Sequence, residues 1–451
     1  MGKKALVLGL GKSGMAAARL LVRQGYQVQV QDTSNSPGLL QQKSELEPLG
    51  VTITLEQPFT IPAPLPELVV VSPGVPWNVP VLQELRAQGV DVIGEMGLAW
   101  RSLCPYPWVG ITGTNGKTTT TSLIAAILTT AGYRAVACGN IGTPACDLVG
   151  QDVDWIVAEI SSFQIESSPE IAPQIGVWTT FTPDHLDRHH TLENYCRIKT
   201  HLLAQSQVKV FNADDPYLRA NFSQRWPDIL WTSTQGMSHL PPSQKTGIYI
   251  ENKQVIVEGK AIFNLDNFAM SGNHNRQNLL LAIAVAHVLH IPPAVITQAM
   301  QNFPGVPHRL EVLGTHQGIT YINDSKATNY DAAQVGLASM TEPTILLAGG
   351  KAKVGDDHTW LQTIQDKAAG VVLFGASAHQ FAERLRSINY TDFVVVNDLA
   401  EAVTAAQELA QRARAKIILL SPACASFDQY PNFEARGDHF RQLVQNVFMT
   451  H

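Results

Sequence analysis

The chain has 451 residues, of which 45% are hydrophobic and 16% are charged, and its formal net charge is −6. This length exceeds what one hydrophobic core supports, and the hydrophobic content excludes global disorder. The negative charge argues against a nucleic-acid partner or a polybasic membrane anchor. No apolar run approaches the ~20 residues of a membrane span. The 5 cysteines are scattered and form no CxxC pair, so we expect a cytoplasmic protein without disulfides or a cysteine zinc site.

Short β-branched runs alternate with helical stretches along the chain, which predicts an α/β fold with parallel sheets. The strands expected first are at 5–9, 27–32, 67–72, 108–112, 154–160 and 176–181. Turn-rich material from Gly236 to Asp266 also has some β character, and a buried helix is expected at 277–290. The strands expected last are at 319–323, 344–348, 370–374, 393–396 and 416–420.

A Pro- and Gly-rich segment, Phe303 to Pro307, predicts a hinge, because these residues punctuate helices and stiffen turns. We expect three domains, at 1–93, 94–303 and 304–451. The first and third have a Rossmann-like pattern, and the second has the pattern of a P-loop NTPase.

The first glycine-rich motif, GLGKSG at 9–14, lies between a predicted strand and a predicted helix. Glycines in this position let the backbone approach a pyrophosphate at a helix N-terminus. Asp32 ends the next strand, at about the 20-residue offset where a carboxylate reaches a ribose hydroxyl. Taken alone, the motif indicates a nicotinamide dehydrogenase, or merely a tight turn that allows helix packing.

The second motif, TGTNGKTT at 112–119, also lies between an apolar strand and a helix. Its backbone N–H groups would surround phosphates, Lys117 would bridge the β and γ oxygens, and the Thr118 hydroxyl would reach Mg²⁺. The strict Walker pattern requires Gly at position 111, where this chain has Ile. The GKT core, between a strand and a helix, still favours binding of a nucleoside triphosphate, ATP or GTP.

Two further segments lie where a P-loop protein places its metal ligands. Glu159 closes the apolar run 155–158, and the polar stretch 182–190 follows the next predicted strand. An acidic residue at such a strand end positions Mg²⁺. An ordinary strand-end carboxylate and a surface histidine-rich loop are the alternatives.

Taken together, these motifs resemble the Mur ligases, the ATP-dependent amide-forming enzymes of peptidoglycan precursor synthesis. The segments that carry the resemblance are GTNGKTT at 113–119, EISSFQ at 159–164, DHLDRH at 184–189, SGNHN at 271–275, PHR at 307–309, NDSKATN at 323–329 and SPACASFD at 421–428. The resemblance covers essentially the whole chain. The segments at 323 and 421 resemble the branch that adds D-glutamate to UDP-N-acetylmuramoyl-L-alanine.

The resemblance implies a role for each motif residue. The first domain would hold the UDP of the substrate instead of a nicotinamide, through Gly11, Lys12, Ser13, Gly14, Asp32, Thr33, Ser72, Pro73 and Gly74, and Asn140 of the second domain would help to hold the same substrate. ATP would be bound by Gly113, Thr114, Asn115, Gly116, Lys117, Thr118, Thr119, Asn275, Asn278, Arg309 and Asp324. D-Glutamate would be bound by Lys326, Thr328, Lys353, Ser426 and Phe433.

The resemblance also implies two Mg²⁺ ions, held by Thr118, Glu159, His185 and Lys199. Lys199 matches a lysine that this family carries as a carbamate, whose oxygens suit Mg²⁺ as an ammonium cannot. Lys117, His185 and Lys199 would therefore be the catalytic residues. The resemblance also implies an acyl-phosphate intermediate, and we expect the enzyme to be a monomer.

Other functions remain open at the level of sequence. A dehydrogenase would leave the P-loop unused, and a P-loop regulatory switch would explain only the second domain. Another Mur ligase or a folylpolyglutamate synthetase-like ligase is the nearest alternative within related enzymes. Phosphate release that requires both substrates would discriminate among these possibilities.

Overall fold

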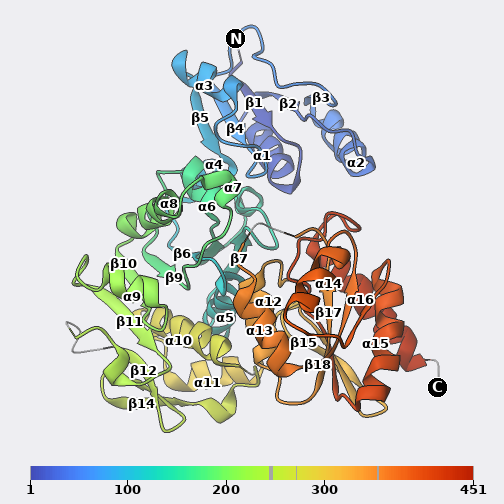
Figure 1. Ribbon diagram of the computed structural model, residues 1–451. Coiled ribbons are helices and arrows are strands. Elements are labelled where there is room, and N and C mark those ends of the chain that lie inside the picture. The colour runs from blue at the N-terminus through green and yellow to red at the C-terminus, as the bar shows by residue number, and fades with distance from the viewer. Residues whose placement is uncertain (1, 243–246, 271, 353–354, 450–451) are drawn as a thin grey trace. The chain divides into compact units, whose positions relative to one another are not determined.

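The computed structural model describes residues 2–242, 247–270, 272–352 and 355–449 (Figure 1). Contacts divide the chain into two compact units, one of residues 1–269 and 275–303 and the other of residues 270–274 and 304–451. In the part of the chain that the structure describes, the first unit contains two β-sheets and the second contains one. Within the described residues, no helix is long and apolar enough to cross a bilayer.

The N-terminal sheet of the first unit has the strand order β3-β2-β1-β4-β5, and all its neighbouring strands are parallel. Its strands are β1 (Lys4–Leu8), β2 (Gln27–Gln31), β3 (Thr52–Thr54), β4 (Leu68–Val71) and β5 (Asp91–Gly94). Its helices are α1 (Lys12–Arg23), α2 (Pro37–Leu46) and α3 (Pro80–Ala87), and α4 (Glu95–Leu103) follows β5. The strand order reverses between β1 and β4, where a parallel sheet opens a crevice for ligands.

The second sheet of this unit has the order β14-β13-β12-β11-β10-β9-β6-β8-β7. Its parallel strands are β6 (Trp108–Thr112), β7 (Ala135–Gly139), β8 (Trp155–Glu159), β9 (Ile175–Trp178), β10 (Val208–Asn212), β11 (Ile229–Ser233) and β12 (Ile248–Glu251). The antiparallel strands β13 (Gln254–Val257) and β14 (Lys260–Asn264) complete it, which confirms the β character expected for this segment.

The helices around the second sheet are α5 (Lys117–Thr130), α6 (Ser162–Ser167), α7 (Leu186–His189), α8 (Leu192–Gln205), α9 (Pro216–Phe222), α10 (Asn273–Val288) and α11 (Pro293–Gln301). The segment Leu279–Ala286 of α10 is buried along its entire length and packs with Val109 and Ile111 of β6 in one core. The buried helix predicted there is confirmed, although it begins at Asn273, before the expected start.

The sheet of the second unit has the order β15-β16-β20-β17-β18-β19. Its strands are β15 (Glu311–His316), β16 (Ile319–Asn323), β17 (Thr344–Gly349), β18 (Ala368–Phe374), β19 (Phe393–Val395) and β20 (Ile417–Leu420). All pairs are parallel except β15 with β16. Its helices are α12 (Tyr330–Ala338), α13 (His358–Lys367), α14 (Ala378–Ser387), α15 (Leu399–Ala413) and α16 (Phe433–Met449).

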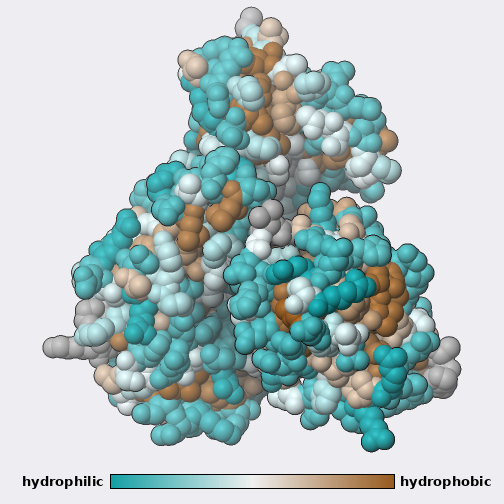
Figure 2. Space-filling model, viewed as in Figure 1, coloured by the Kyte–Doolittle hydropathy of each residue, from teal (hydrophilic) through white to brown (hydrophobic). Residues whose placement is uncertain are grey.

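The central strands are apolar because both faces of these sheets are covered. In β17, Ile345 and Leu347 enter one core, whereas Leu346 and Ala348 enter the core on the opposite face. Hydrophilic residues cover much of the face visible in Figure 2, with smaller brown areas between them. The α/β architecture with parallel sheets is confirmed.

Candidate active site

The loop between β6 and α5 has the backbone that a phosphate-binding loop requires. Gly113 has φ 149° and Gly116 has φ 83°, conformations that favour glycine. A Cβ on Gly113 would lie 2.0 Å from Oγ1 of Thr179, and one on Gly116 would lie 2.5 Å from Oδ1 of Asn278. Because β6 lies between β8 and β9, the residues at the ends of these strands surround the loop. Glycine is thus needed at both positions for conformation and for space.

The segment after β9 holds the loop in place. The N–H of Thr114 donates to the carbonyl oxygen of Thr180 over 2.8 Å, and the N–H of Asn115 donates to Oγ1 of Thr180 over 2.9 Å. Oγ1 of Thr114 donates to the carbonyl of Thr182 and lies 3.3 Å from the hydroxyl of Tyr195. Sequence reasoning missed Thr180 and Tyr195, since only the fold brings them to the loop.

Glu159, at the end of β8, joins two of the predicted site residues. Its Oε2 accepts a 2.8 Å hydrogen bond from Oγ1 of Thr118, and its Oε1 accepts a 2.8 Å bond from Nδ2 of Asn140. The Glu159 side chain is buried. A hydroxyl beside a buried carboxylate at the start of a P-loop helix is a donor set that suits Mg²⁺. Thr118 and Glu159 therefore fit the metal that the sequence implies.

Lys117 is the first residue of α5, and its Nζ donates to the carbonyl oxygens of Gly113 and Thr114 over 3.0 and 2.8 Å. The ammonium group thus lies across the loop that would cradle phosphate. Thr119, one residue further along the helix, is buried.

Lys199, in α8, is a lysine whose side chain is buried beneath the P-loop. It is 1% exposed, and its Nζ donates to the carbonyl of Gly113 over 2.9 Å and to Oγ1 of Thr112 over 3.3 Å. Burial, with the charge of Lys117 as a second cause, holds the pKa of Lys199 well below its ordinary value. A lysine amine must be unprotonated to react with CO₂, so this environment suits a carbamate.

His185 and His189, in the segment after β9, have different surroundings. His185 adopts φ 55°, packs edge-on against Phe163 at 4.9 Å and lies 3.5 Å from a carboxylate oxygen of Asp184. His189 is buried, its Nε2 lies 2.9 Å from Oγ of Ser162, and burial lowers its pKa to about 4. His189 is thus a neutral packing residue, and His185 is the more accessible of the two.

Among the described residues, no three His, Cys, Asp or Glu side chains converge as a ready-made metal cluster. A Mg²⁺ ion bound through one or two protein oxygens, substrate phosphates and water requires no such cluster. The hydroxyl of Thr118, the carboxylate of Glu159 and a carbamate on Lys199 would match that mode of binding.

Asn275 and Asn278 are both buried near the start of α10. Oδ1 of Asn278 accepts a 3.3 Å hydrogen bond from Oγ1 of Thr120 and lies beside Gly116. The second asparagine therefore borders the P-loop directly.

The predicted UDP residues of the N-terminal sheet follow the carboxyl ends of β1, β2 and β4, whereas Asn140, which is bonded to Glu159, follows β7 of the second sheet. The N–H of Leu10 donates to Asp32 over 2.7 Å, and Oγ of Ser72 donates to the carbonyl of Gly9 over 2.8 Å. A Cβ on Gly14 would lie 1.9 Å from the Gly9 oxygen, so glycine lets α1 approach the strand end. Around this turn, Gly11, Lys12, Thr33 and Gly74 are exposed, whereas Ser13 and Pro73 are partly buried.

In the second unit, Asp324 follows β16 and Ser421 follows β20, its neighbour in the sheet. Oγ of Ser421 donates to Asp324 over 2.8 Å, and the N–H of Leu310 donates to the other oxygen over 3.3 Å. Burial raises the pKa of Asp324 to about 7, against the opposing effects of Ser421 and Arg309. Arg309 and Asp324, the two residues of this unit expected to contact ATP, thus lie close enough for the charge of Arg309 to lower the pKa of Asp324.

The residues predicted to bind D-glutamate gather at the same edge of this sheet. The ammonium of Lys326 lies 3.8 Å from the ring centroid of Phe433, a cation–π contact, and the N–H of Thr328 donates to the carbonyl of Lys326 over 2.8 Å. Ser426 is buried after β20. Lys353 lies outside the described residues.

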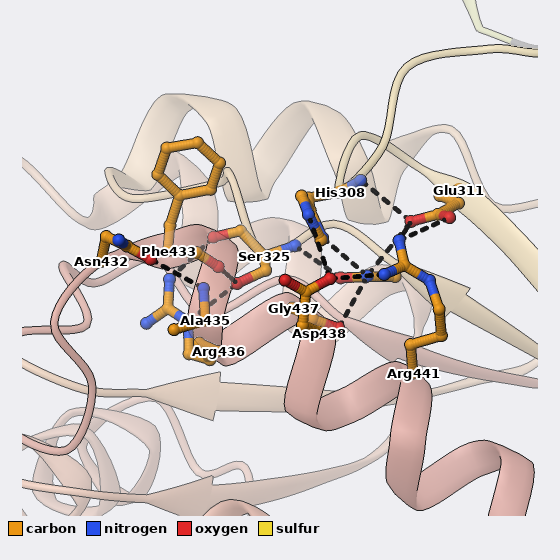
Figure 3. Close-up of polar contacts among 11 residues, drawn as sticks. His308, Glu311, Ser325, Asn432, Phe433, Ala435, Arg436, Gly437, Asp438 and Arg441 are labelled. Carbon is orange, nitrogen blue, oxygen red and sulfur yellow. Dashed lines mark hydrogen bonds and ion pairs between the residues drawn. The ribbon is translucent and has the colours of Figure 1, made fainter. Parts of the chain in front are cut away.

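Figure 3 shows a side chain that sequence reasoning missed, Arg436, beside Ser325 and Phe433. It donates to both the hydroxyl and the carbonyl of Ser325. Ser325 belongs to the NDSKATN segment, but no spacing in the sequence links it to Arg436, 111 positions away.

Comparison with known protein families matches each part of this chain. Residues 3–94 match the Mur ligase MurD-like N-terminal domain, residues 111–286 match the Mur ligase middle domain, and residues 308–424 match the Mur ligase glutamate ligase domain. The UDP-N-acetylmuramoylalanine–D-glutamate ligase of Gloeothece citriformis is 53% identical over 443 residues, covering 98% of this chain and 99% of that protein. The ligase of the same name from Trichormus variabilis is 54% identical over 448 residues, covering 98% of each chain.

Solved structures show the same three-domain fold at low sequence identity. The UDP-N-acetylmuramate–alanine ligase of Thermotoga maritima aligns with a TM-score of 0.62 at 18% identity, covering 99% of this chain and 100% of that one. A pseudomurein peptide ligase type C from Methanothermus fervidus aligns with a TM-score of 0.62 at 20% identity, with the same coverage. With its three matching domains and relatives above 50% identity over nearly the full length, the chain belongs to the Mur ligase family.

Proposed function

We propose that this enzyme joins D-glutamate to UDP-N-acetylmuramoyl-L-alanine at the expense of ATP, in the cytoplasmic synthesis of peptidoglycan precursors. The observation that carries the phosphoryl-transfer chemistry is the set of contacts at the P-loop. Thr118 bonds to buried Glu159, and Lys117 and Lys199 share the carbonyl oxygen of Gly113. The amino-acid specificity is supported by the near-full-length relatives named D-glutamate ligases.

The reaction begins with activation of a carboxylate, which by itself resists attack by an amine. A carboxylate oxygen of the UDP-substrate attacks the γ-phosphorus of ATP, the bond from phosphorus to the β,γ-bridging oxygen breaks, and ADP leaves. Lys117 and the N–H groups of residues 113–118 would hold the transferred phosphoryl group and offset its charge. Two Mg²⁺ ions would be held by Thr118, Glu159, His185 and carbamylated Lys199. When bound, these ions would supply further positive charge for the phosphoryl transfer.

The acyl phosphate then reacts with the amine of D-glutamate. The nitrogen attacks the acyl carbon, a tetrahedral intermediate forms, and the carbon–oxygen bond to phosphate breaks as the amine loses a proton. Lys326, Thr328 and Lys353 would orient the α-carboxylate of D-glutamate, with Ser426 and Phe433 near its γ-carboxylate. Positioning of the amine against the acyl carbon is the main contribution of these residues to the rate.

The remaining contacts would select the two nucleotides. The turn at Gly11–Gly14, together with Asp32, Thr33, Ser72–Gly74 and Asn140, would bind UDP. Asn275 and Asn278 would hold adenine, Arg309 the ATP phosphates and Asp324 the ribose. We further propose that the enzyme is a monomer of three domains, at 1–93, 94–303 and 304–451, with a hinge at 304–307.

The direct test is phosphate release by the purified protein with ATP and Mg²⁺, with each substrate omitted in turn. We expect release only when UDP-N-acetylmuramoyl-L-alanine and an amino acid are both present. A panel of D-glutamate, L-lysine, diaminopimelate and L-alanine identifies the acceptor. Activity with another acceptor would indicate a different Mur ligase, and release without any amino acid would favour a P-loop regulatory protein.

A further inference from the structure

Arg436 is a fully buried arginine whose hydrogen-bond acceptors are all uncharged. It is 0% exposed on α16, and it donates through Nε to Oγ of Ser325 over 3.0 Å, through Nη2 to the carbonyl of Ser325 over 2.7 Å and through Nη1 to the carbonyl of Cys424 over 3.1 Å. Figure 3 shows its guanidinium group directed at Ser325. Burial lowers the pKa of Arg436 to about 10, so the side chain still carries its charge at neutral pH.

An arrangement of this kind is costly for stability alone. A buried charge loses its hydration, and replacement of buried charged groups by packed apolar groups is often neutral or stabilising. The planar guanidinium, by contrast, can hold several backbone and side-chain acceptors in one fixed geometry. The three hydrogen bonds of Arg436 therefore indicate a role beyond stability.

They connect two loops that follow adjacent strands of the sheet. Ser325 follows β16 and Cys424 follows β20. Lys326 is the next residue after Ser325, and Ser426 comes two residues after Cys424. Ser325 is also bonded to α16 from its own side, since its Oγ donates to the carbonyl of Phe433 over 2.9 Å.

A third loop lies against the same guanidinium group. Gly350 follows β17, the strand on the other side of β20, and a Cβ at this position would lie 3.2 Å from Nη1 of Arg436. The next residue, Lys351, exchanges two backbone hydrogen bonds with Ala425, of 2.8 and 3.0 Å. One side chain thus borders the loops at the ends of β16, β20 and β17.

We propose that Arg436 is a positioning residue for the acceptor amino acid, which sets the relative placement of the Lys326 and Ser426 loops at the carboxyl ends of β16 and β20. This inference rests on the proposed function, because it assigns the acceptor to that edge of the sheet. A dicarboxylic amino acid must meet cationic and hydroxyl groups from both loops at once, so a small shift between them weakens binding at one of its two carboxylates. The buried positive charge also favours an anionic acceptor there.

The same helix offers a matched control, Arg441, which contacts the first residue of β15 instead. Its Nη2 donates to both carboxylate oxygens of Glu311, over 2.9 and 3.0 Å, and Glu311 in turn accepts from the N–H of His308. His308 precedes Arg309, the residue expected at the ATP phosphates. In Figure 3 the contacts of Arg436 lie near the start of α16 and those of Arg441 lie further along the helix, and Asn323 links the two groups through Ser325 and Glu311. Arg412, exposed on α15, provides a control for loss of a surface arginine.

The experiment compares Arg436→Met, Arg436→Lys, Arg441→Met and Arg412→Met in steady-state kinetics, with thermal unfolding of each. For Arg436→Met we expect the KM for D-glutamate to rise about ten- to hundredfold, the range for hydrogen bonds to a charged donor. The KM for ATP should stay within about twofold, and single-turnover ADP formation without D-glutamate should persist, since that step precedes acceptor binding. Arg441→Met should raise the KM for ATP instead, and Arg412→Met should change neither.

Arg436→Lys keeps the charge but loses the fork of donors, so it should lie between the wild type and Arg436→Met. If Arg436→Met does not fold, the lysine variant alone decides, through a raised KM for D-glutamate at an unchanged KM for ATP. Equal losses for both substrates, or unchanged kinetics in folded variants, would overturn the inference. If the wild type uses another amino acid, the proposed function fails on that point, and the same comparison is made with the accepted amino acid.

Discussion

The Nζ atom of Lys199 donates a 2.9 Å hydrogen bond to the carbonyl oxygen of Gly113, although the two residues are 86 positions apart in the chain. The same oxygen accepts from Nζ of Lys117 over 3.0 Å. Two lysines therefore converge on one carbonyl of the P-loop, one at its surface and one buried beneath it. Each has a separate consequence that can be measured.

For Lys199, we expect Lys199→Ala to abolish turnover and short carboxylic acids to restore part of it. Burial keeps the pKa of this amine low, so a neutral nitrogen is available to react with CO₂. An added carboxylate would supply, in the vacated space, the oxygens that a carbamate provides. Mass spectrometry of the intact protein with ¹³C-labelled bicarbonate would reveal the modification. Rescue should be absent in Lys117→Ala. An active Lys199→Ala enzyme, together with a wild-type Lys199 that carries no carbamate, would refute this assignment.

For Lys117, we expect Lys117→Ala to lower kcat by about two to three orders of magnitude, as loss of one charge-stabilising donor does at such sites. Its contacts are with the loop carbonyls of Gly113 and Thr114, so the fold should survive. Kinetics and thermal unfolding should be measured on the same preparation. Near-normal turnover would exclude the P-loop assignment.

Glu95 should make the stability depend on pH. It is buried at the start of α4, accepts from the N–H of Cys146 over 2.9 Å, and burial raises its pKa to about 7. Between its ordinary pKa of 4.5 and about 7, the folded state keeps a proton that the unfolded state has lost. This carboxyl therefore lowers the free energy of unfolding progressively as the pH rises through that range, and by a constant amount above it.

Glu95→Gln removes this titration while its amide oxygen can still accept from Cys146. We expect the variant to gain stability over the wild type between pH 5 and 7, up to about 3 kcal/mol, with no further gain above pH 7. Urea unfolding across this range measures the difference. Glu45→Gln, at an exposed position of α2, is the control for loss of a surface carboxylate. A pH-independent difference for Glu95→Gln would contradict the prediction.

Gly14 should tolerate no side chain. A Cβ there would lie 1.9 Å from the carbonyl oxygen of Gly9, so α1 would have to move away from the end of β1. We expect Gly14→Ala to lower the free energy of unfolding by about 1–3 kcal/mol, as overpacking does, and to weaken binding of the UDP-substrate. Gly38→Ala in α2 is the matched helical control, because its Cβ would meet only Oγ of Ser36 at 3.9 Å. In denaturant unfolding, the free energy of unfolding should fall for Gly14→Ala and rise for Gly38→Ala. The rise is expected because alanine has a higher helix propensity than glycine where no clash opposes it.

The segment 304–307 should act as a hinge. Pro304 and Pro307 fix φ, and Gly305 between them has φ 87° and nothing within 4 Å of a Cβ, so the segment has one permissive point. ATP that contacts both Lys117 and Asp324 would favour a closed arrangement. Small-angle scattering should therefore show a smaller radius of gyration with an ATP analogue and the UDP-substrate. An unchanged radius at confirmed saturation would indicate a preassembled site.

The sequence alone determined the elements whose conformation is local. The turns at Gly9–Gly14 and Gly113–Gly116 were identifiable because their backbone needs glycine, and that requirement is written in adjacent residues. Strand β6 at Trp108–Thr112 and strand β16 at Ile319–Asn323 agree with their predicted bounds, because both are short runs rich in β-branched and aromatic residues. The predictions did not include β3, β5, β7, β10, β11 or β15, of which β3 and β5 are short strands with polar residues at exposed positions.

Tertiary structure decided the chemical state of the side chains. Lys199 in the sequence is indistinguishable from a solvated helical lysine, and only the packing of α8 against the P-loop buries it. Arg436 and Glu95 were equally hidden, because their partners Ser325 and Cys146 lie 111 and 51 positions away. Desolvation and hydrogen bonding depend on which distant segments the fold brings together, and one sequence records these long-range contacts only indirectly.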